Sequence, residues 1–128
     1  MDRSTILKTF NDHFLEFLDD ISRVFPDDTD VAATKTALLA IRKANPRLII
    51  QSWKEYVVAP YRAKIDSGDM SFFIEKDFTH DLRDVDGNSS ILDKIDTLRD
   101  EVRSMSKDDQ LKAMKYVQNL TKLSDLYV

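Results

Sequence analysis

The segment ILKTFNDHFLEFLDDISRVFP occupies residues 6–26 and places its apolar residues at alternating steps of three and four. This spacing puts them on one face of an α-helix. The stripe consists of Leu7, Phe10, Phe14, Phe17, Ile21 and Val24. Pro26 cannot continue the helix, because it has no backbone N–H and its ring clashes with the preceding turn. The sequence therefore predicts a helix that ends near Val24 and, with three phenylalanines on one stripe, lies at the centre of the fold.

Proline and glycine divide the chain that follows. Side chains at residues 27–30 can accept hydrogen bonds from free backbone N–H groups, which favours a second helix over residues 29–43. Asn45 as the N-cap, with Pro46 at the first helical position, predicts a third helix. Pro60 is expected to interrupt that helix and to open a short one, which Gly68 ends.

The C-terminal half holds one ambiguous segment and two helical patterns. Residues 70–78 include Met70 and three phenylalanines, and they fit a short helix or an extended segment laid over the core. After a loop over residues 84–90, helical spacing resumes at residue 91. The string SKDD at 106–109 resembles a capping box with Asp in place of Glu, and it opens a last helix. Its predicted stripe is Leu111, Met114, Val117, Leu120 and Leu123.

These patterns predict one all-α domain over residues 1–128, a compact bundle of five to seven helices without a sheet. A chain of 128 residues suits one core of ordinary size. The connections are short, as helix bundles require, and the alternating pattern of a half-buried strand is absent.

Composition excludes several classes of protein. The chain has no cysteine, which removes disulfides, thiolate catalysis and Cys-ligated metals. Its two glycines are too few for a phosphate-binding loop or a dinucleotide fingerprint. The longest apolar run is far short of the ~20 residues that span a bilayer, and the N-terminus does not resemble a signal peptide. We therefore expect a soluble, intracellular protein without membrane association.

Candidate catalytic and metal-binding groups are few. His13 lies beside the apolar stripe near acidic residues, where a solvated histidine is the simpler interpretation, and His80 has no triad partner at suitable spacing. The loop around Gly87 has the alternating oxygen ligands of a calcium-binding loop, but Leu82 stands where the first ligand should be. The sequence therefore predicts a protein that is not an enzyme and that holds no cofactor or metal.

Charge is divided into blocks along the chain. Residues 1–30 carry a net −5, 31–65 a net +6, 66–101 a net −7 and 102–128 a net +2. The basic residues of 31–65 are either neutralised by acidic neighbours or gathered into a patch for an anionic partner. That patch would consist of Lys35, Arg42, Lys43, Arg47, Lys54, Arg62 and Lys64. Trp53, Tyr56 and Tyr61 could stack on bases there, but Trp53 and Tyr56 share a helical stripe with Ile49 and are more readily explained as core.

Aromatic residues supply a second candidate surface. Phe72 and Phe73 cannot both point inward on a helix, because consecutive positions differ by ~100°. Either one of them is exposed for protein docking, or the segment closes the bundle and is buried on two sides. Near the C-terminus, Tyr116, Leu120, Leu126 and Tyr127 exceed what a small core is expected to bury.

Six strings resemble a family of small uncharacterised proteins encoded by large DNA viruses that infect algae and other protists. They are FN at 10–11, FLDD at 17–20, VFPD at 24–27, KANP at 43–46, GD at 68–69 with FF at 72–73, and KYVQNLTKLS at 115–124. The resemblance covers most of the chain and carries no catalytic signature. It implies a viral origin, and it favours a virion component or an adaptor acting in the infected host cell.

The functional prediction is a non-enzymatic viral protein–protein interaction module, virion-associated or involved in assembly. Its expected partner is another viral or host protein, or a second copy of the chain, because blocks of opposite charge suit electrostatic docking. The alternative is a nucleic-acid-binding protein that uses the basic 31–65 region. A net charge of −4 argues against this alternative, since nucleic-acid-binding domains are usually basic.

Overall fold

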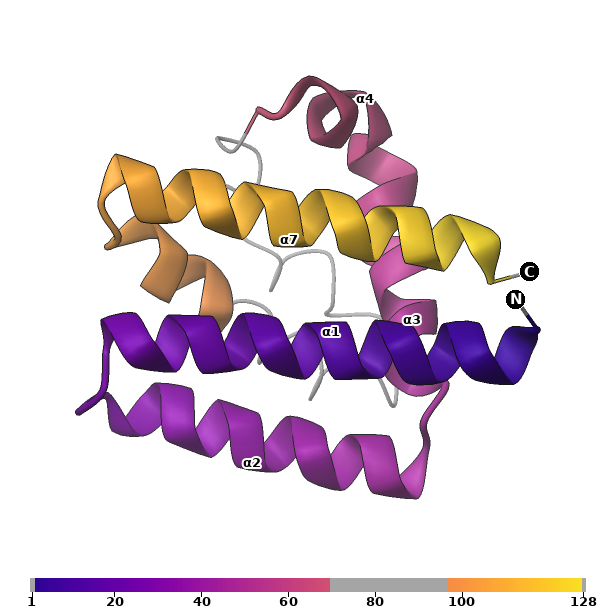
Figure 1. Ribbon diagram of the computed structural model, residues 1–128, viewed down its shortest axis with the longest axis horizontal. Coiled ribbons are helices and arrows are strands. Elements are labelled where there is room, and N and C mark those ends of the chain that lie inside the picture. Colours follow the sequence, from indigo (N-terminus) through magenta and orange to yellow (C-terminus); the bar gives the residue numbers. More distant parts are fainter. Residues whose placement is uncertain (1, 70–96, 128) are drawn as a thin grey trace.

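The computed structural model describes residues 2–69 and 97–127, and every regular element within those two ranges is helical (Figure 1). This confirms the predicted all-α class for the described part of the chain. The elements are α1 (Arg3–Val24), α2 (Thr29–Ala44), α3 (Leu48–Trp53), the π-helix η1 (Lys54–Val58), α4 (Ala59–Ser67), a helical segment over 97–103, and α7 (Lys107–Leu126). The predictions for Phe72, Phe73, His80 and the loop at 84–90 lie outside the described residues.

Helix α1 is the central element, as its phenylalanine stripe predicts. It lies between α2 and α7, which both run antiparallel to it, and it also contacts α3 (Figure 1). The Asp2 side chain caps its start by accepting the Thr5 N–H at 2.8 Å. The helix ends at Val24, just before Pro26, as predicted.

The junction between α2 and α3 corrects one prediction. Asn45 is not the N-cap of the third helix: its backbone N–H closes α2 on Ile41, and its side chain makes no cap bond to α3. The third helix begins at Leu48, two residues after Pro46. The turn is held instead from a distance, because the buried Asn11 side chain of α1 donates to the Pro46 carbonyl at 3.0 Å.

Pro60 does not break the third helix in the expected way. The chain continues from α3 into α4 through the wider π-helical turn η1, and the irregular backbone of Tyr61 follows. Pro60 cannot bond to the Tyr56 carbonyl four residues earlier, and a wider turn keeps its ring clear of that oxygen. Gly68 then ends α4 as predicted, with φ = 75° and its N–H bonded to the Ile65 carbonyl.

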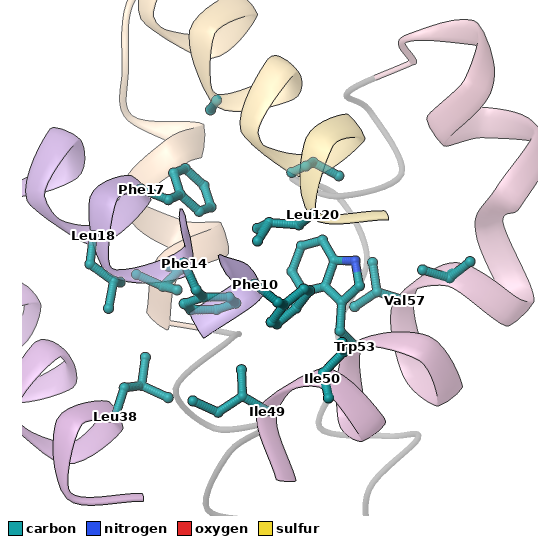
Figure 2. Packing of buried hydrophobic residues seen from close by; sticks show 14 of the residues in the cluster. Phe10, Phe14, Phe17, Leu18, Leu38, Ile49, Ile50, Trp53, Val57 and Leu120 are labelled. Carbon is teal, nitrogen blue, oxygen red and sulfur yellow. The ribbon is translucent and has the colours of Figure 1, made fainter. Parts of the chain in front are cut away.

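The core is built around Trp53, which is 1% exposed. Figure 2 shows its indole among the side chains of α1 and α7. The ring meets Phe10 and Phe14 edge-on, with centroids 6.3 and 5.8 Å away. Its Nε1–H donates to the Thr121 hydroxyl of α7 at 3.3 Å. Trp53 therefore links α1, α3 and α7, and the core interpretation of this residue is confirmed.

Helix α7 begins as predicted and buries most of the predicted stripe, with Met114, Val117 and Leu120 in the core. Ser106 caps it by accepting the Asp109 N–H at 3.3 Å. The predicted stripe is only partly right, because Leu111 is 64% exposed while two polar residues, Thr121 and Ser124, are buried. Thr121 is buried as the hydrogen-bond partner of the Trp53 N–H, so a polar side chain lies in the core beside the predicted Leu120.

Candidate functional site: a groove between α1 and α7

The antiparallel pair α1 and α7 encloses a groove on its outer side. Helix α1 lines it with residues at steps of four and three between positions 9 and 23, and α7 lines it with residues between positions 112 and 123. One hollow of about 370 Å³ is lined by His13, Glu16, Asp20, Arg23, Lys112, Lys115, Tyr116 and Asn119. A second hollow of about 320 Å³ is lined by Thr9, His13, Asn119, Lys122 and Leu123. His13 and Asn119 border both hollows, so the two adjoin along the helix seam. We call the pair the α1–α7 groove.

Tyr116 is fixed in position within this groove. Its ring stacks on Phe17 with centroids 5.2 Å apart and an interplanar angle of 18°. The His13 ring lies against it as well, at 4.9 Å. Burial raises the pKa of the Tyr116 phenol, and the nearby charges of Asp20 and Glu16 raise it further. The groove therefore contains a neutral aromatic ring that is already ordered, which reduces the entropy lost when a ligand packs on it.

The two walls of the groove carry opposite charge. On the α1 wall are the carboxylates of Glu16 and Asp20, and Arg23 is paired with Asp20 at 2.8 Å. On the α7 wall are Lys112, Lys115 and Lys122, which make no ion pair with any described residue. Cations without an internal partner are free to pair with carboxylates of a ligand.

His13 is less solvated than its sequence neighbours suggest. Its side chain is only 21% exposed, and its Nδ1 lies 3.3 Å from a Glu16 oxygen. Its Nε2 is buried and has no hydrogen-bond partner among the described residues. The expectation of a solvated histidine is wrong because the cover comes from Tyr116 on α7, which the local sequence of α1 cannot reveal. Within residues 2–69 and 97–127, no group of three or more His, Cys, Asp or Glu side chains could hold a metal ion.

Four of the seven predicted patch cations are engaged inside the protein. Lys35 pairs with Asp19, and Lys54 donates to the Tyr127 carbonyl. Arg42 lies 2.7 Å from Asp12, whose pKa is lowered by hydrogen bonds from Arg42 and Lys8. Arg62 binds Asp125 through two bonds of 2.8 and 2.9 Å, and this contact lowers the pKa of that carboxyl. The three that are exposed and make no ion pair with the described residues are Lys43, Arg47 and Lys64. Local neutralisation, the simpler of the two alternatives, therefore applies to most of the basic block.

Tyr127 is not part of an accessible surface. It is 5% exposed, and the Arg3 guanidinium lies 4.8 Å from its ring centroid. Leu120 is buried as well, whereas Leu126 is 54% exposed. The prediction of an exposed Tyr127 is wrong because the two ends of the chain lie close together (Figure 1), which brings Arg3 of α1 over the ring.

Comparison with known protein families, curated sequences and solved structures finds no match. None of the helices in the described ranges combines the length and the apolar character needed to span a bilayer.

A second cluster, made by two carboxyl groups, affects stability. Glu101 lies on the helical segment over 97–103, and it hydrogen-bonds Asp28, the N-cap of α2. Burial raises the pKa of Glu101 to about 7, and the charges of Asp28, Asp30 and Asp100 add to the effect. The same hydrogen bond lowers the pKa of Asp28. Below about pH 7 Glu101 therefore keeps its proton and donates a hydrogen bond to the Asp28 carboxylate.

We expect the free energy of unfolding to fall as pH rises from 4.5, the ordinary pKa of this carboxyl, to about 7. Between these values the folded state keeps a proton that the unfolded state has released. Glu101→Gln keeps a hydrogen-bond donor and removes the titration, so its urea midpoint should depend less on pH between about pH 5 and about pH 8. Glu55→Gln, at an exposed carboxylate, should keep the wild-type dependence. Equal pH dependence of wild type and Glu101→Gln would contradict this assignment.

Proposed function

We propose that this chain is a non-enzymatic protein–protein interaction module that docks its partner in the α1–α7 groove. The observation that carries the proposal is the ordered Tyr116 ring between walls of opposite charge. An ordered aromatic ring supplies binding energy, and the charged walls select the partner and its register. A virion-associated or assembly role in an infected cell is the setting that the resemblance adds to this proposal.

The nucleic-acid alternative receives less support. Four of the seven basic residues on which it relies already have internal partners, and Trp53 is buried.

The test is affinity capture from infected-cell extract with two charge-matched variants of the full chain. Lys112→Glu/Lys115→Glu reverses two charges in the groove, and Lys43→Glu/Arg47→Glu reverses two exposed charges outside it. We expect wild type and the outside variant to capture the same protein in the presence of nuclease, and the groove variant to lose it. Titration calorimetry with that protein, purified, should reproduce the order of affinities.

Two outcomes would refute the proposal. One is capture that disappears with nuclease and with Lys43→Glu/Arg47→Glu, which would favour the nucleic-acid alternative. The other is capture that the groove variant retains in full. Circular dichroism and thermal unfolding of both variants establish that each is folded.

A further inference from the structure

The walls of the α1–α7 groove favour one class of peptide ligand, if the groove is the docking site proposed above. The groove walls lie within the interiors of two helices, residues 9–23 of α1 and 112–123 of α7. Backbone N–H and C=O groups there are bonded along their own helices, so the groove offers a ligand only side chains. A ligand strand could not add itself to a sheet edge at this site. An α-helix bonds its own backbone groups internally, so it suits a groove that offers only side chains.

The groove is long enough for a helical ligand of several turns. The α1 stripe from residue 9 to residue 23 extends over about 21 Å, which a ligand helix of ~14 residues lying along it would span. Side chains at steps of three and four form ridges on α1 and α7, and the ridges of a third helix pack into the grooves between them. The apolar contacts available to such a helix are Tyr116 in one hollow and Leu123 in the other.

The charge of the groove determines the chemistry of that helix. Four cations line the two hollows (Arg23, Lys112, Lys115 and Lys122), against the carboxylates of Glu16 and Asp20. The groove is therefore locally positive on a chain whose net charge is −4. The three lysines all lie on α7, so the attraction acts on one edge of the ligand.

We infer that the α1–α7 groove binds an amphipathic α-helix of a partner protein, with its apolar stripe over Tyr116 and Leu123 and an acidic edge facing α7. Such a helix has the spacing that the walls present, and it brings carboxylates to the three lysines. Its affinity falls with increasing salt, because the lysines are at the surface.

The probes for this inference are three fluorescein-labelled peptides of about 20 residues, which share one Leu and Phe stripe at helical spacing. The first has Glu along one edge. The second has Lys in place of those Glu residues, and the third is the first with two central prolines. We expect the Glu peptide to bind full-length protein about tenfold or more tightly than the Lys peptide, and the proline peptide to lose binding. Fluorescence anisotropy measures all three.

Two variants of the protein show whether the peptides bind in the α1–α7 groove. Lys112→Glu/Lys115→Glu should reverse the preference between the Glu and Lys peptides, while Lys43→Glu/Arg47→Glu should leave it unchanged. Equal affinities for the Glu and Lys peptides, or full binding by the proline peptide, would overturn the inference. So would self-association in sedimentation that Lys112→Glu/Lys115→Glu abolishes, because the occupant would then be a second copy of the chain.

The failures of the two proposals can be told apart. A captured partner that requires the groove, but binds it through an extended or basic segment, would overturn the helical ligand and leave the docking function intact. A partner and peptides that are all insensitive to the groove variant would overturn both.

Discussion

Phe14→Ala should lower the free energy of unfolding by about 3–5 kcal/mol. The Phe14 ring is buried in the central helix and contacts both Trp53 and Phe17, so its removal leaves a cavity among aromatic rings that cannot move to fill it. Since domains of this size are typically stable by only ~5–15 kcal/mol, the loss is a large part of the total. Urea denaturation followed by Trp53 fluorescence measures the change.

Leu111→Ala is the matched control for Phe14→Ala. It also truncates a large apolar side chain, but Leu111 is 64% exposed and the change should be within about 0.5 kcal/mol of wild type. Similar losses in the two variants would contradict the placement of α1 at the centre of the core.

Trp53→Ala should be as destabilising, by about 3–5 kcal/mol, because Trp53 fills the space between three helices. The same substitution also distinguishes the protein-interaction module from the nucleic-acid-binding alternative. A base-stacking tryptophan would lose ~1–3 kcal/mol of binding to a single strand on substitution and leave stability almost unchanged. Circular dichroism during urea denaturation is the appropriate measurement, because the variant lacks the only tryptophan.

Trp53→Phe and Thr121→Val separate packing from hydrogen bonding at the same site. Trp53→Phe keeps an aromatic ring, removes the N–H donor and leaves a smaller cavity, so its loss should lie between wild type and Trp53→Ala. In a double-mutant cycle the pair should show coupling, since each single change breaks the same bond. Strictly additive losses would exclude a contribution from that bond.

Signals within a few residues are sufficient to predict the buried face of α1 and the ends of several helices. The apolar spacing of α1 predicts its buried face, and Pro26 predicts its end. Ser106 caps α7 and Gly68 ends α4 as predicted, because a side-chain oxygen and a left-handed φ act within a few residues. The prediction for Asn45 is wrong, since the adjoining turn is held by Asn11, a residue of α1 far earlier in the chain.

The candidate site depends on contacts between helices that are distant in sequence. The sequence around His13, Glu16 and Asp20 gives no sign of a site. They line a groove only because the fold places Tyr116 and the lysines of α7 beside them. The spacing of the α7 lysines is visible in the sequence, but the basic block over 31–65 carries more charge and is the stronger signal. Most of that block is paired inside the protein, with carboxylates on α1 and α7 or with a backbone carbonyl.

The amino-acid sequence is enough to predict the helical class, the start and end of most helices, and the central place of α1. These properties follow from backbone geometry and hydrophobic spacing, which act over one or two turns. Which charges are unpaired, that Tyr127 is buried, and where the groove lies could be learned only from the folded chain. They depend on residues far apart in sequence, because ion pairing and burial are set by the neighbour across a helix interface.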